Sequence, residues 1–437
     1  MLHSLSARTK QPPLAAKIVL GLGYGVMLSA YYTWLSDRFM FPGYPWYPPD
    51  FFLWAVGLLL CTLPMLLLPY KTETASQFLV AFLYFLYLFQ VIIVKFFVVE
   101  NIKPYFFWCD VVLTLVFILL ILILRLPKPE IPTVRLSYAG YVGTLFVASF
   151  AMLAFVVRDF GFTLTLPSLY DVYGVRAQFR LYTQEASALG RYAVFWLSYA
   201  LIPLLLTIGL SLFKKHRLVA TFLMIYCFGV ALYIFAFTGF KSTALAVPAV
   251  FAMYCLFGYI RYSINILLMF YLTFLLSLVL FLIGYDFIFV NIVRRIFIVS
   301  GLNHSYFLEY FSHQPPLALA HSLLQGLAEN HVDNAPTFAI GAYYYGSAMA
   351  SANSGIFADA FANFGFLGIL LAGLLLGILL YLLDIVSRGI DMKVVGPPLV
   401  ITAYVLTYSG ILTVLNTYGL LWLLIAYWLY PRREGSL

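Results

Sequence analysis

Long apolar runs separated by short polar segments dominate the hydropathy pattern of this chain. Runs long enough to cross a bilayer fall at residues 15–35, 51–69, 77–97, 105–124, 137–157, 192–213, 218–237, 243–260, 264–284, 356–383, 397–415 and 417–430. The last two runs are short and could also form one re-entrant hairpin. The pattern predicts an all-α polytopic membrane protein with about 12 transmembrane helices, folded as a single integral membrane domain over residues 1–437.

The composition supports a membrane protein and excludes a soluble globular one. Hydrophobic residues make up 64% of the chain and charged residues only 10%, far from the averages of soluble domains. Aromatic residues reach 19%, so we expect some rings to form interfacial belts and others to line a groove. The cysteines all fall within apolar runs, where packing is expected rather than disulfide formation; they are Cys61, Cys109, Cys227 and Cys255.

The distribution of lysine and arginine predicts the orientation of the chain. Short basic loops, such as KKHR at 214–217 and RLPKPEIPTVR at 125–135, are typical of the cytoplasmic side. This assignment puts both termini in the cytoplasm and leaves two long extracytoplasmic loops, residues 158–191 and 285–351. Loops of this length without structure of their own are usually functional.

The first extracytoplasmic loop carries closely spaced arginines. Arg176 and Arg180 are one helical turn apart, and a continuous helix would bring Arg191 to within about 60° of Arg176. Like charges at this spacing repel each other, so a shared anion would stabilise them. Alternatively, these arginines lie at the membrane edge and pair with the acidic residues of the loop, which are Asp159, Asp171 and Glu185. Arg158 is expected to be a helix-end anchor.

Two further stretches outside the membrane carry candidate chemistry. The turn FTGFKST places Lys241 at a helix start, beside Gly239, Ser242 and Thr243, where backbone N–H groups and the helix dipole favour a phosphate. The second extracytoplasmic loop holds several charged or titratable residues: Arg294, Arg295, Glu309, His304, His313, His321 and His331.

A polar-to-apolar stretch at 352–373 reads ANSGIFADAFANFGFLGILLAG. Its polar cluster of Asn353, Ser354, Asp359 and Asn363 runs into a long apolar segment without a proline. This pattern is typical of a transmembrane helix whose polar end lines a water-filled cavity and whose apolar body lies in lipid. Asp359 lies near the hydrocarbon edge, where a carboxylate needs an ionic partner or a function. No DxD, HExxH, CxxC, Walker or dinucleotide motif is present, so no metal, nucleotide or other cofactor is expected.

The same stretch resembles the signature of the bacterial oligosaccharide repeat-unit polymerases, the O-antigen polymerase family. YDVYGVRAQFR before the sixth apolar run and FTGFKST before the eighth resemble two further features of that family, in the same order, so that the three motifs span 170–373. The runs before residue 137 match only as generic hydrophobic helices. Related O-antigen ligases carry a histidine beside the first asparagine of the signature, where this chain has Ala352.

The resemblance implies a glycosyltransferase of the bacterial inner membrane with a fold similar to the GT-C type. Its substrates would be undecaprenyl-diphosphate-linked oligosaccharides, joined at the periplasmic face into O-antigen, capsular or exopolysaccharide chains, with undecaprenyl diphosphate as leaving group. Membrane lipids would be partners and a chain-length regulator is a candidate partner, whereas nucleic acid is not. The alternatives are an O-antigen ligase-type transferase and a lipid-linked oligosaccharide flippase, although the chain shows no internal repeat of the transporter kind.

This chemistry indicates roles for the residues named above. Without a metal, cations must stabilise the diphosphate, and the candidates in order of preference are Arg176, Arg180 and Lys241, followed by Arg191, Arg294 and Arg295. A catalytic base must take the proton of the acceptor hydroxyl, and the candidates are Asp359, Glu309 and His313. Glycan contacts are expected from Asn353, Tyr343, Tyr344 and Tyr345.

Overall fold

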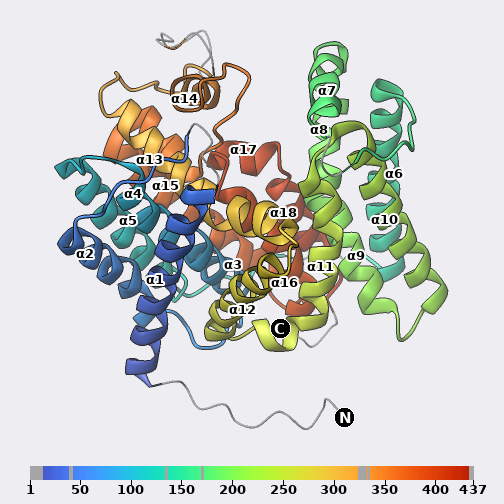
Figure 1. Ribbon diagram of the computed structural model, residues 1–437. Helices are drawn as coiled ribbons and strands as arrows, with labels where there is room; N and C mark the ends of the chain where they lie inside the picture. The colour runs from blue at the N-terminus through green and yellow to red at the C-terminus, as the bar shows by residue number, and fades with distance from the viewer. Residues whose placement is uncertain are drawn as a thin grey trace. The chain divides into compact units, whose positions relative to one another are not determined.

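The computed structural model describes residues 13–38, 43–132, 136–168, 172–322, 332 and 335–432 (Figure 1). Asp171 and His331, named above, lie outside these residues, as does Arg135. The described chain is all-helical; an isolated antiparallel bridge joins Lys71 to Tyr262, and no strand forms in these ranges.

Contacts between residues divide the chain into two compact units. Unit 1 comprises residues 1–72, 83–123 and 262–374, and unit 2 comprises 73–82, 124–261 and 375–437. The helices of unit 1 are α1 (Leu14–Arg38), α2 (Phe51–Thr62), η1 (Leu63–Leu66), η2 (Tyr84–Leu88), α4 (Phe89–Val98), α5 (Pro104–Ile123), α12 (Ser263–Leu282), η4 (Phe289–Ile298), α13 (Val299–Phe311), α14 (Pro336–Tyr345) and the first part of α15 (Ile356–Ser387).

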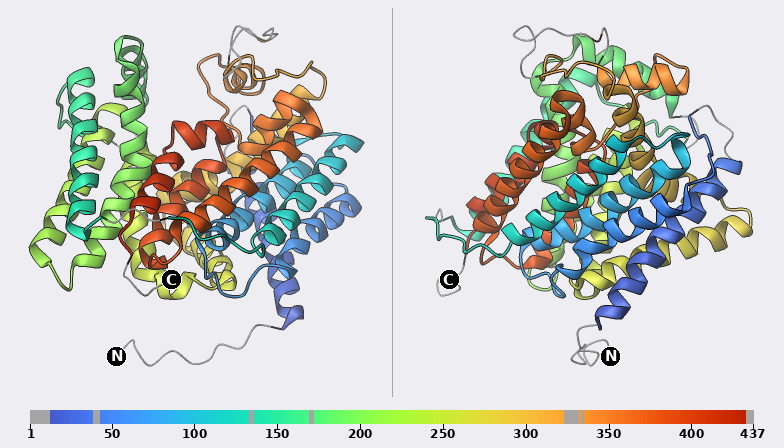
Figure 2. Two further views of the ribbon diagram at one scale, coloured as in Figure 1. Left: turned by 180° about the vertical axis from the view of Figure 1, so that it is seen from behind. Right: turned by 90° about the vertical axis from the view of Figure 1, so that its left-hand side faces the viewer.

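Unit 2 contains most of α3, the end of α15 and the remaining helices. They are α3 (Ala75–Leu83), α6 (Tyr138–Phe160), α7 (Tyr173–Glu185), α8 (Ala188–Trp196), η3 (Leu197–Leu201), α9 (Ile202–Leu212), α10 (Arg217–Thr238), α11 (Lys241–Ile260), α16 (Met392–Leu406), α17 (Ile411–Asn416) and α18 (Leu420–Leu429). Within this unit α6 and α10 lie side by side (Figure 2), with Phe146 packed against Phe222 and Tyr226.

Among the described residues, nine helices are long and apolar enough to cross a membrane. They are Leu14–Arg38, Ala75–Val98, Pro104–Ile123, Tyr138–Phe160, Ala188–Leu212, Arg217–Thr238, Lys241–Ile260, Ser263–Leu282 and Ile356–Ser387. The other three predicted runs correspond to shorter apolar helices at Phe51–Leu66, Met392–Leu406 and Leu420–Leu429. The structure therefore supports a polytopic membrane protein, whereas the count of twelve spans and the GT-C fold stay predictions.

The two segments predicted as long loops contain helices. Residues 158–191 include α7 and the start of α8, and residues 285–351 include η4, α13 and α14. Helix α13 is buried from Ser300 to Leu308, so this segment forms part of the core of unit 1. Its mixture of Asn, His, Ser and Glu with apolar residues hides that burial from a hydropathy pattern.

Within the described ranges, three π-helical segments interrupt α-helices and carry residues with polar partners. η2 contains Tyr87, whose hydroxyl lies 3.2 Å from His304 Nδ1, and η3 contains Tyr199, whose hydroxyl lies 2.7 Å from Ser242 Oγ. η4 carries Arg294 and Arg295. Insertions of this kind occur often at functional sites. Here each one contains a candidate residue or a side chain that lies against a residue of the candidate segments.

Helix α15 is broken at the centre of the polar-to-apolar stretch. Phe364 and Gly365 leave helical geometry, and Gly365 has φ 61° and ψ −143°, a region used almost only by glycine. The carbonyls of Ala362 and Asn363 just before the break accept hydrogen bonds from Leu317 N (3.0 Å) and Ala318 N (3.1 Å). The expected smooth run from polar to apolar helix is therefore two helices joined by a kink.

Replacing Gly365 by alanine is expected to destabilise the protein by about 1–3 kcal/mol, because a residue with a Cβ rarely adopts the backbone angles of this position. No steric clash adds to that cost. An added Cβ would meet no atom within 4 Å there. Gly143, in the interior of α6, is an equally uncrowded control, and alanine should stabilise it by up to about 1 kcal/mol. Equilibrium unfolding in mixed micelles measures both, and a harmless Gly365→Ala would contradict the kinked geometry.

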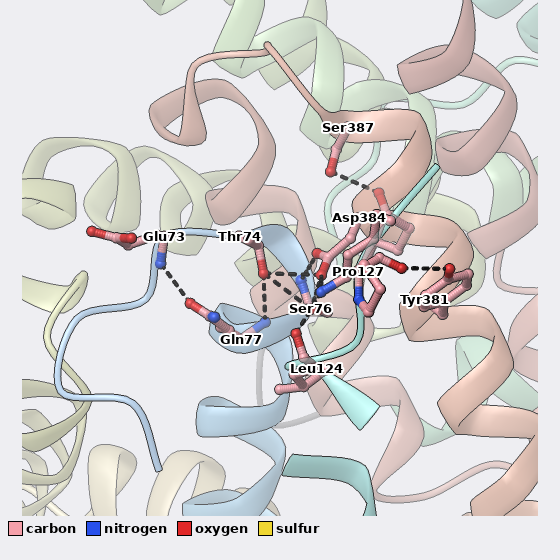
Figure 3. A network of polar contacts seen from close by, with 11 residues as sticks. Glu73, Thr74, Ser76, Gln77, Leu124, Pro127, Tyr381, Asp384 and Ser387 are labelled. Atoms are coloured by element: carbon pink, nitrogen blue, oxygen red, sulfur yellow. Dashed lines mark hydrogen bonds and ion pairs between the residues drawn. The ribbon is translucent and has the colours of Figure 1, made fainter. Parts of the chain in front are cut away.

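A buried carboxylate connects three segments of unit 2 (Figure 3). Asp384 of α15 is 6% exposed and accepts hydrogen bonds from Ser76 N (2.8 Å), Ser76 Oγ (2.5 Å) and Thr74 Oγ1 (3.1 Å). Lys128 Nζ lies 3.1 Å from the same carboxylate. The contacts satisfy the first turn of α3 in the manner of a helix cap, so Asp384 is a structural residue of the unit.

Candidate functional site

Within unit 2, the structure brings Arg176 into contact with the turn that precedes Lys241. Arg176 Nε donates a hydrogen bond to Gly239 O at 3.0 Å, and its guanidinium carbon lies 5.6 Å from the centre of the Phe240 ring. Gly239 has φ 64°, and a Cβ there would lie 2.9 Å from Val172 O. Glycine is therefore required for α7 to approach this turn. Two motifs that are distant in the sequence thus meet.

The turn itself presents the positive end of α11. Lys241 is the first residue of the helix, and its N-cap residue Phe240 provides no side-chain hydrogen bond. Thr243 Oγ1 donates back to Phe240 O at 2.7 Å, and Ser242 is held by Tyr199. Two cations at a helix N-terminus make an electrostatic environment that favours a bound phosphate group.

The other arginines of this region occupy different positions. Arg180 lies one turn further along α7 and is exposed. The helix is not continuous to Arg191, because α7 ends at Glu185 and Ala186 is extended (φ −67°, ψ 147°). Ser187 then caps α8 by accepting from Gly190 N at 3.1 Å, so Arg191 belongs to a new helix.

Arg158 is the helix-end anchor that the sequence predicts. Its Nε lies 2.8 Å from Asp159 Oδ1, and one terminal nitrogen donates to Ser187 Oγ at 3.0 Å. Asp159 Oδ2 also accepts from Ser187 N at 3.1 Å. The group joins the end of α6 to the cap of α8, which accounts for Arg158 and Asp159 without a ligand.

Within unit 1, the polar residues of the 352–363 stretch hold neighbouring segments in place. Asn353 O accepts from Asn303 Nδ2 at 2.7 Å, and Asn303 Oδ1 accepts from the Tyr345 hydroxyl at 2.7 Å. Asn363 is buried; its Oδ1 accepts from Leu319 N and its Nδ2 donates to Asp359 O, both at 2.8 Å. The Asn363 bond to Leu319 fixes the loop after α13 against the kink of α15, and the Asn303 bonds join α13 to Asn353 and to the end of α14.

The three candidate bases lie in different surroundings. Glu309 is half-buried, and its Oε2 accepts from the Tyr344 hydroxyl at 2.9 Å. His313 is exposed, with Nε2 3.0 Å from Lys103 Nζ. Asp359 is partly buried near Tyr87 and makes no ion pair within the part of the chain that the structure describes.

The remaining candidates of unit 1 also have distinct neighbours. Tyr344 stacks on Tyr306 with ring centres 3.9 Å apart, whereas Tyr343 is 71% exposed. Arg294 donates from Nε to Val290 O at 3.2 Å and lies beside Tyr44, with 3.4 Å between its terminal nitrogen and the Tyr44 hydroxyl. Arg295 acts on Tyr345 electrostatically. Arg294 and Arg295 thus belong to unit 1, and the other candidate cations to unit 2.

The structure adds a buried histidine that the sequence did not single out as a base. His304 is 1% exposed, Tyr87 lies against its Nδ1, and its Nε2 has no hydrogen-bond partner among the described residues. Burial lowers the pKa of His304 to about 3, so the imidazole is neutral at pH 7. Gly355 makes room for the Tyr87 hydroxyl, which a Cβ at that position would overlap. The first glycine of the signature therefore has a packing role.

Unit 1 also contains a buried ion pair between Lys95 and Asp110, which are 1% and 3% exposed. Its partners come from α4 and α5, so nothing in the local pattern of either run reveals it. A buried pair of this kind leaves an uncompensated charge when one partner is removed.

A cavity of about 240 Å³ lies between the end of α13 and the kink of α15. Its lining residues are Tyr105, Phe311, Ser312, Gln314, Pro316, Phe361, Ala362, Gly365 and Phe366. No group of three or more His, Cys, Asp or Glu side chains with metal-site geometry occurs in the described ranges.

Comparison of the chain with models of protein families, with characterised proteins and with solved structures finds no match.

Proposed function

We propose that this protein polymerises polyprenyl-diphosphate-linked oligosaccharide repeat units at the periplasmic face of the inner membrane, with undecaprenyl diphosphate as leaving group. The observation that carries the proposal is the hydrogen bond between Arg176 and Gly239, which brings Arg176 to the start of α11 beside Lys241. A metal-independent transferase needs such fixed positive charge where the diphosphate develops negative charge.

The proposed reaction forms one glycosidic bond and breaks one sugar–phosphate bond. The oxygen of an acceptor hydroxyl attacks the anomeric carbon of the growing chain, and the bonding pair leaves on the lipid diphosphate. Arg176, Arg180 and Lys241 bind that diphosphate, with planar guanidinium groups suited to two parallel hydrogen bonds. The proton of the attacking hydroxyl passes to a carboxylate or imidazole base.

One observation favours an alternative function, that of a lipid-linked oligosaccharide flippase. Lys95 and Asp110 are buried in two candidate membrane spans, and intramembrane charges often mark transport paths. However, Lys95 lies in the last turn of α4 and Asp110 in the second turn of α5, near helix ends rather than at mid-span. The pair is better explained as a structural connection between these two helices.

The decisive assay supplies purified protein in liposomes with one defined lipid-linked repeat unit. A polymerase produces a ladder of chains that lengthen by one repeat unit. A ligase-type transferase yields a ladder-free single product, and only when lipid A is added. A flippase moves the intact substrate across the membrane and forms no new bond. Either of the last two outcomes would contradict the proposal.

Polymerisation is expected to persist in EDTA, because fixed cations replace the metal in the proposed site. The measurement is the initial rate of ladder formation with and without chelator, using a magnesium-dependent glycosyltransferase as a control for effective chelation. Activity that disappears with EDTA and returns with Mg²⁺ or Mn²⁺ would rule out the cation-only stabilisation of the diphosphate.

The orientation predicts which introduced cysteines an impermeant thiol reagent reaches in spheroplasts. In a protein whose exposed Cys255 is replaced by serine, Ser168→Cys and Ser312→Cys should be labelled in intact spheroplasts, because the lysine and arginine bias puts both outside. His216→Cys, in the predicted cytoplasmic loop, should be labelled only after the membrane is opened. The reverse pattern would overturn the orientation.

A further inference from the structure

A lysine and a histidine lie at the edge of the cavity at the kink of α15. His313 follows the lining residue Ser312, and its ring is edge-on to that of the lining residue Tyr105, with ring centres 6.5 Å apart. Lys103 Nζ lies 3.0 Å from His313 Nε2. Both side chains are exposed, and within the described ranges neither forms an ion pair with a carboxylate. The edge of the cavity therefore carries an exposed positive charge.

Lys103 lies at the end of a candidate membrane span. It directly precedes α5, Pro104–Ile123, and Trp108 near the start of that helix is 56% exposed. Exposed tryptophans are typical of the headgroup region of a membrane, so a lysine at this level lies among lipid phosphates. An ammonium has three N–H donors, which allows Lys103 to donate to His313 and to a phosphate oxygen at the same time.

The cavity itself is mainly apolar. Its apolar walls are Phe311, Pro316, Phe361, Ala362, Gly365 and Phe366. Of the polar lining residues, Gln314 is exposed, Ser312 Oγ donates to Glu309 O at 2.8 Å, and the buried Tyr105 hydroxyl lies near Ser312. Apolar cavities of about 150 Å³ stay free of water and bind small hydrocarbons. A cavity of about 240 Å³ with these walls therefore suits a hydrocarbon chain.

The cavity continues into the apolar surface of α15. Phe366 lines the cavity and is itself 38% exposed, and the next exposed side chains along the helix are Leu367 and Leu370. This part of α15 belongs to a candidate membrane span, so these side chains face lipid. A chain of a neighbouring lipid therefore has an apolar path to the cavity.

We infer that this cavity binds an acyl chain of an anionic phospholipid of the bilayer, with the phosphate of that lipid bound by Lys103. His313 is a positioning residue, because its Nε2 accepts the hydrogen bond that holds the ammonium at the edge of the cavity. The inference does not depend on the proposed function, because all of these residues belong to unit 1 and no reaction step is involved.

The charges at the cavity edge favour a phospholipid with one net negative charge. A headgroup with an ammonium of its own would bring a second positive charge to Lys103. A lipid diphosphate carries more negative charge than one ammonium balances. Glu309, which acts electrostatically on Tyr105, adds a carboxylate nearby and would repel a diphosphate more strongly than a singly charged phosphate.

The test maps cross-links from lipids that carry a photoreactive group on an acyl chain. Wild-type protein in phosphatidylcholine nanodiscs receives a trace of photoreactive phosphatidylglycerol or phosphatidylethanolamine, and mass spectrometry identifies the cross-linked residues. We expect Phe361, which is 6% exposed and lines the cavity, to react about fivefold more with phosphatidylglycerol, because one basic residue near the membrane surface contributes about 1 kcal/mol. Leu115, exposed on α5 and outside the cavity, should react equally with both lipids.

Substitutions at Lys103 separate its charge from the fold. Lys103→Ala should make the two lipids react equally at Phe361, whereas Lys103→Arg should keep the preference because the charge remains. Arg38→Ala is the matched control, since Arg38 is an exposed basic residue at the end of α1 and lies outside the cavity. It should retain the fivefold preference. Ser312→Phe, which adds a ring to the cavity wall, should lower cross-linking of Phe361 by both lipids at least fivefold while Leu115 still reacts.

Three results would overturn the phospholipid site. They are an absence of cross-links to Phe361 in the wild-type protein, equal reaction of Phe361 with both lipids, and an unchanged preference in Lys103→Ala. Stronger reaction of Phe361 with photoreactive undecaprenyl diphosphate than with phosphatidylglycerol would also overturn it and would assign the cavity to that lipid. None of these measurements requires polymerisation, so their outcome is separate from that of the ladder assay.

Discussion

Arg176→Ala and Arg180→Ala are each expected to slow polymerisation about 30- to 1000-fold, the loss of about 2–4 kcal/mol of transition-state stabilisation. The proposed diphosphate gains negative charge as the sugar–phosphate bond breaks, so a guanidinium that binds it contributes most in the transition state. Lysine keeps the charge and loses the planar fork, so Arg176→Lys and Arg180→Lys should fall between alanine and wild type. Initial rates at matched protein levels in membranes measure the effect.

Arg158→Ala is the matched control for these variants. Its guanidinium is bound to Asp159 and Ser187, so its removal should leave the rate near that of wild type. If both Arg176→Ala and Arg180→Ala polymerise normally while a Lys241→Ala variant is inactive, the diphosphate lies at the α10–α11 turn alone. The preference for the α7 arginines would then be wrong.

Asp384→Ala is expected to lower the free energy of unfolding by about 3–5 kcal/mol, the range for removing one partner of a buried ion pair. The substitution removes the acceptor of Ser76 and Thr74 and leaves Lys128, only 17% exposed in its side chain, without this carboxylate. Equilibrium unfolding of the purified protein in mixed micelles measures the loss.

Glu130→Ala provides the comparison for Asp384. Glu130 pairs with Arg388 at 3.2 Å, but the two side chains are 63% and 44% exposed, and exposed pairs contribute about 0–1 kcal/mol. A loss in Asp384→Ala that is no larger than the loss in Glu130→Ala would contradict the structural role assigned to the Asp384 contacts.

The positions of the long helices could be predicted from the sequence because span length and hydropathy are local properties. The predicted run 218–237 corresponds to α10 at Arg217–Thr238, and the predicted run 264–284 corresponds to α12 at Ser263–Leu282. The predicted helical spacing of Arg176 and Arg180 is also confirmed, since both lie on α7. The break before Arg191 had a signal in the sequence, because Ser187 is a good N-cap residue.

Contacts between distant segments could not be predicted in this way. The pairs Lys95–Asp110 and Tyr87–His304 join residues from different helices, and no periodicity in either helix encodes the partner. The kink at Gly365 was missed for a related reason. By its pattern, a glycine in an apolar run looks like a tolerated helix residue. The break at Gly365 is accompanied by hydrogen bonds from the distant 317–319 loop to Ala362 and Asn363.

The central claim is that each new glycosidic bond releases one polyprenyl diphosphate. The most direct measurement counts both in one reaction of purified protein with a defined lipid-linked repeat unit, using a label on the sugar and another on the lipid. The account predicts one undecaprenyl diphosphate released for each bond formed, with both quantities falling together in Arg176→Ala. Bond formation without release of undecaprenyl diphosphate, or release without bond formation, would contradict it.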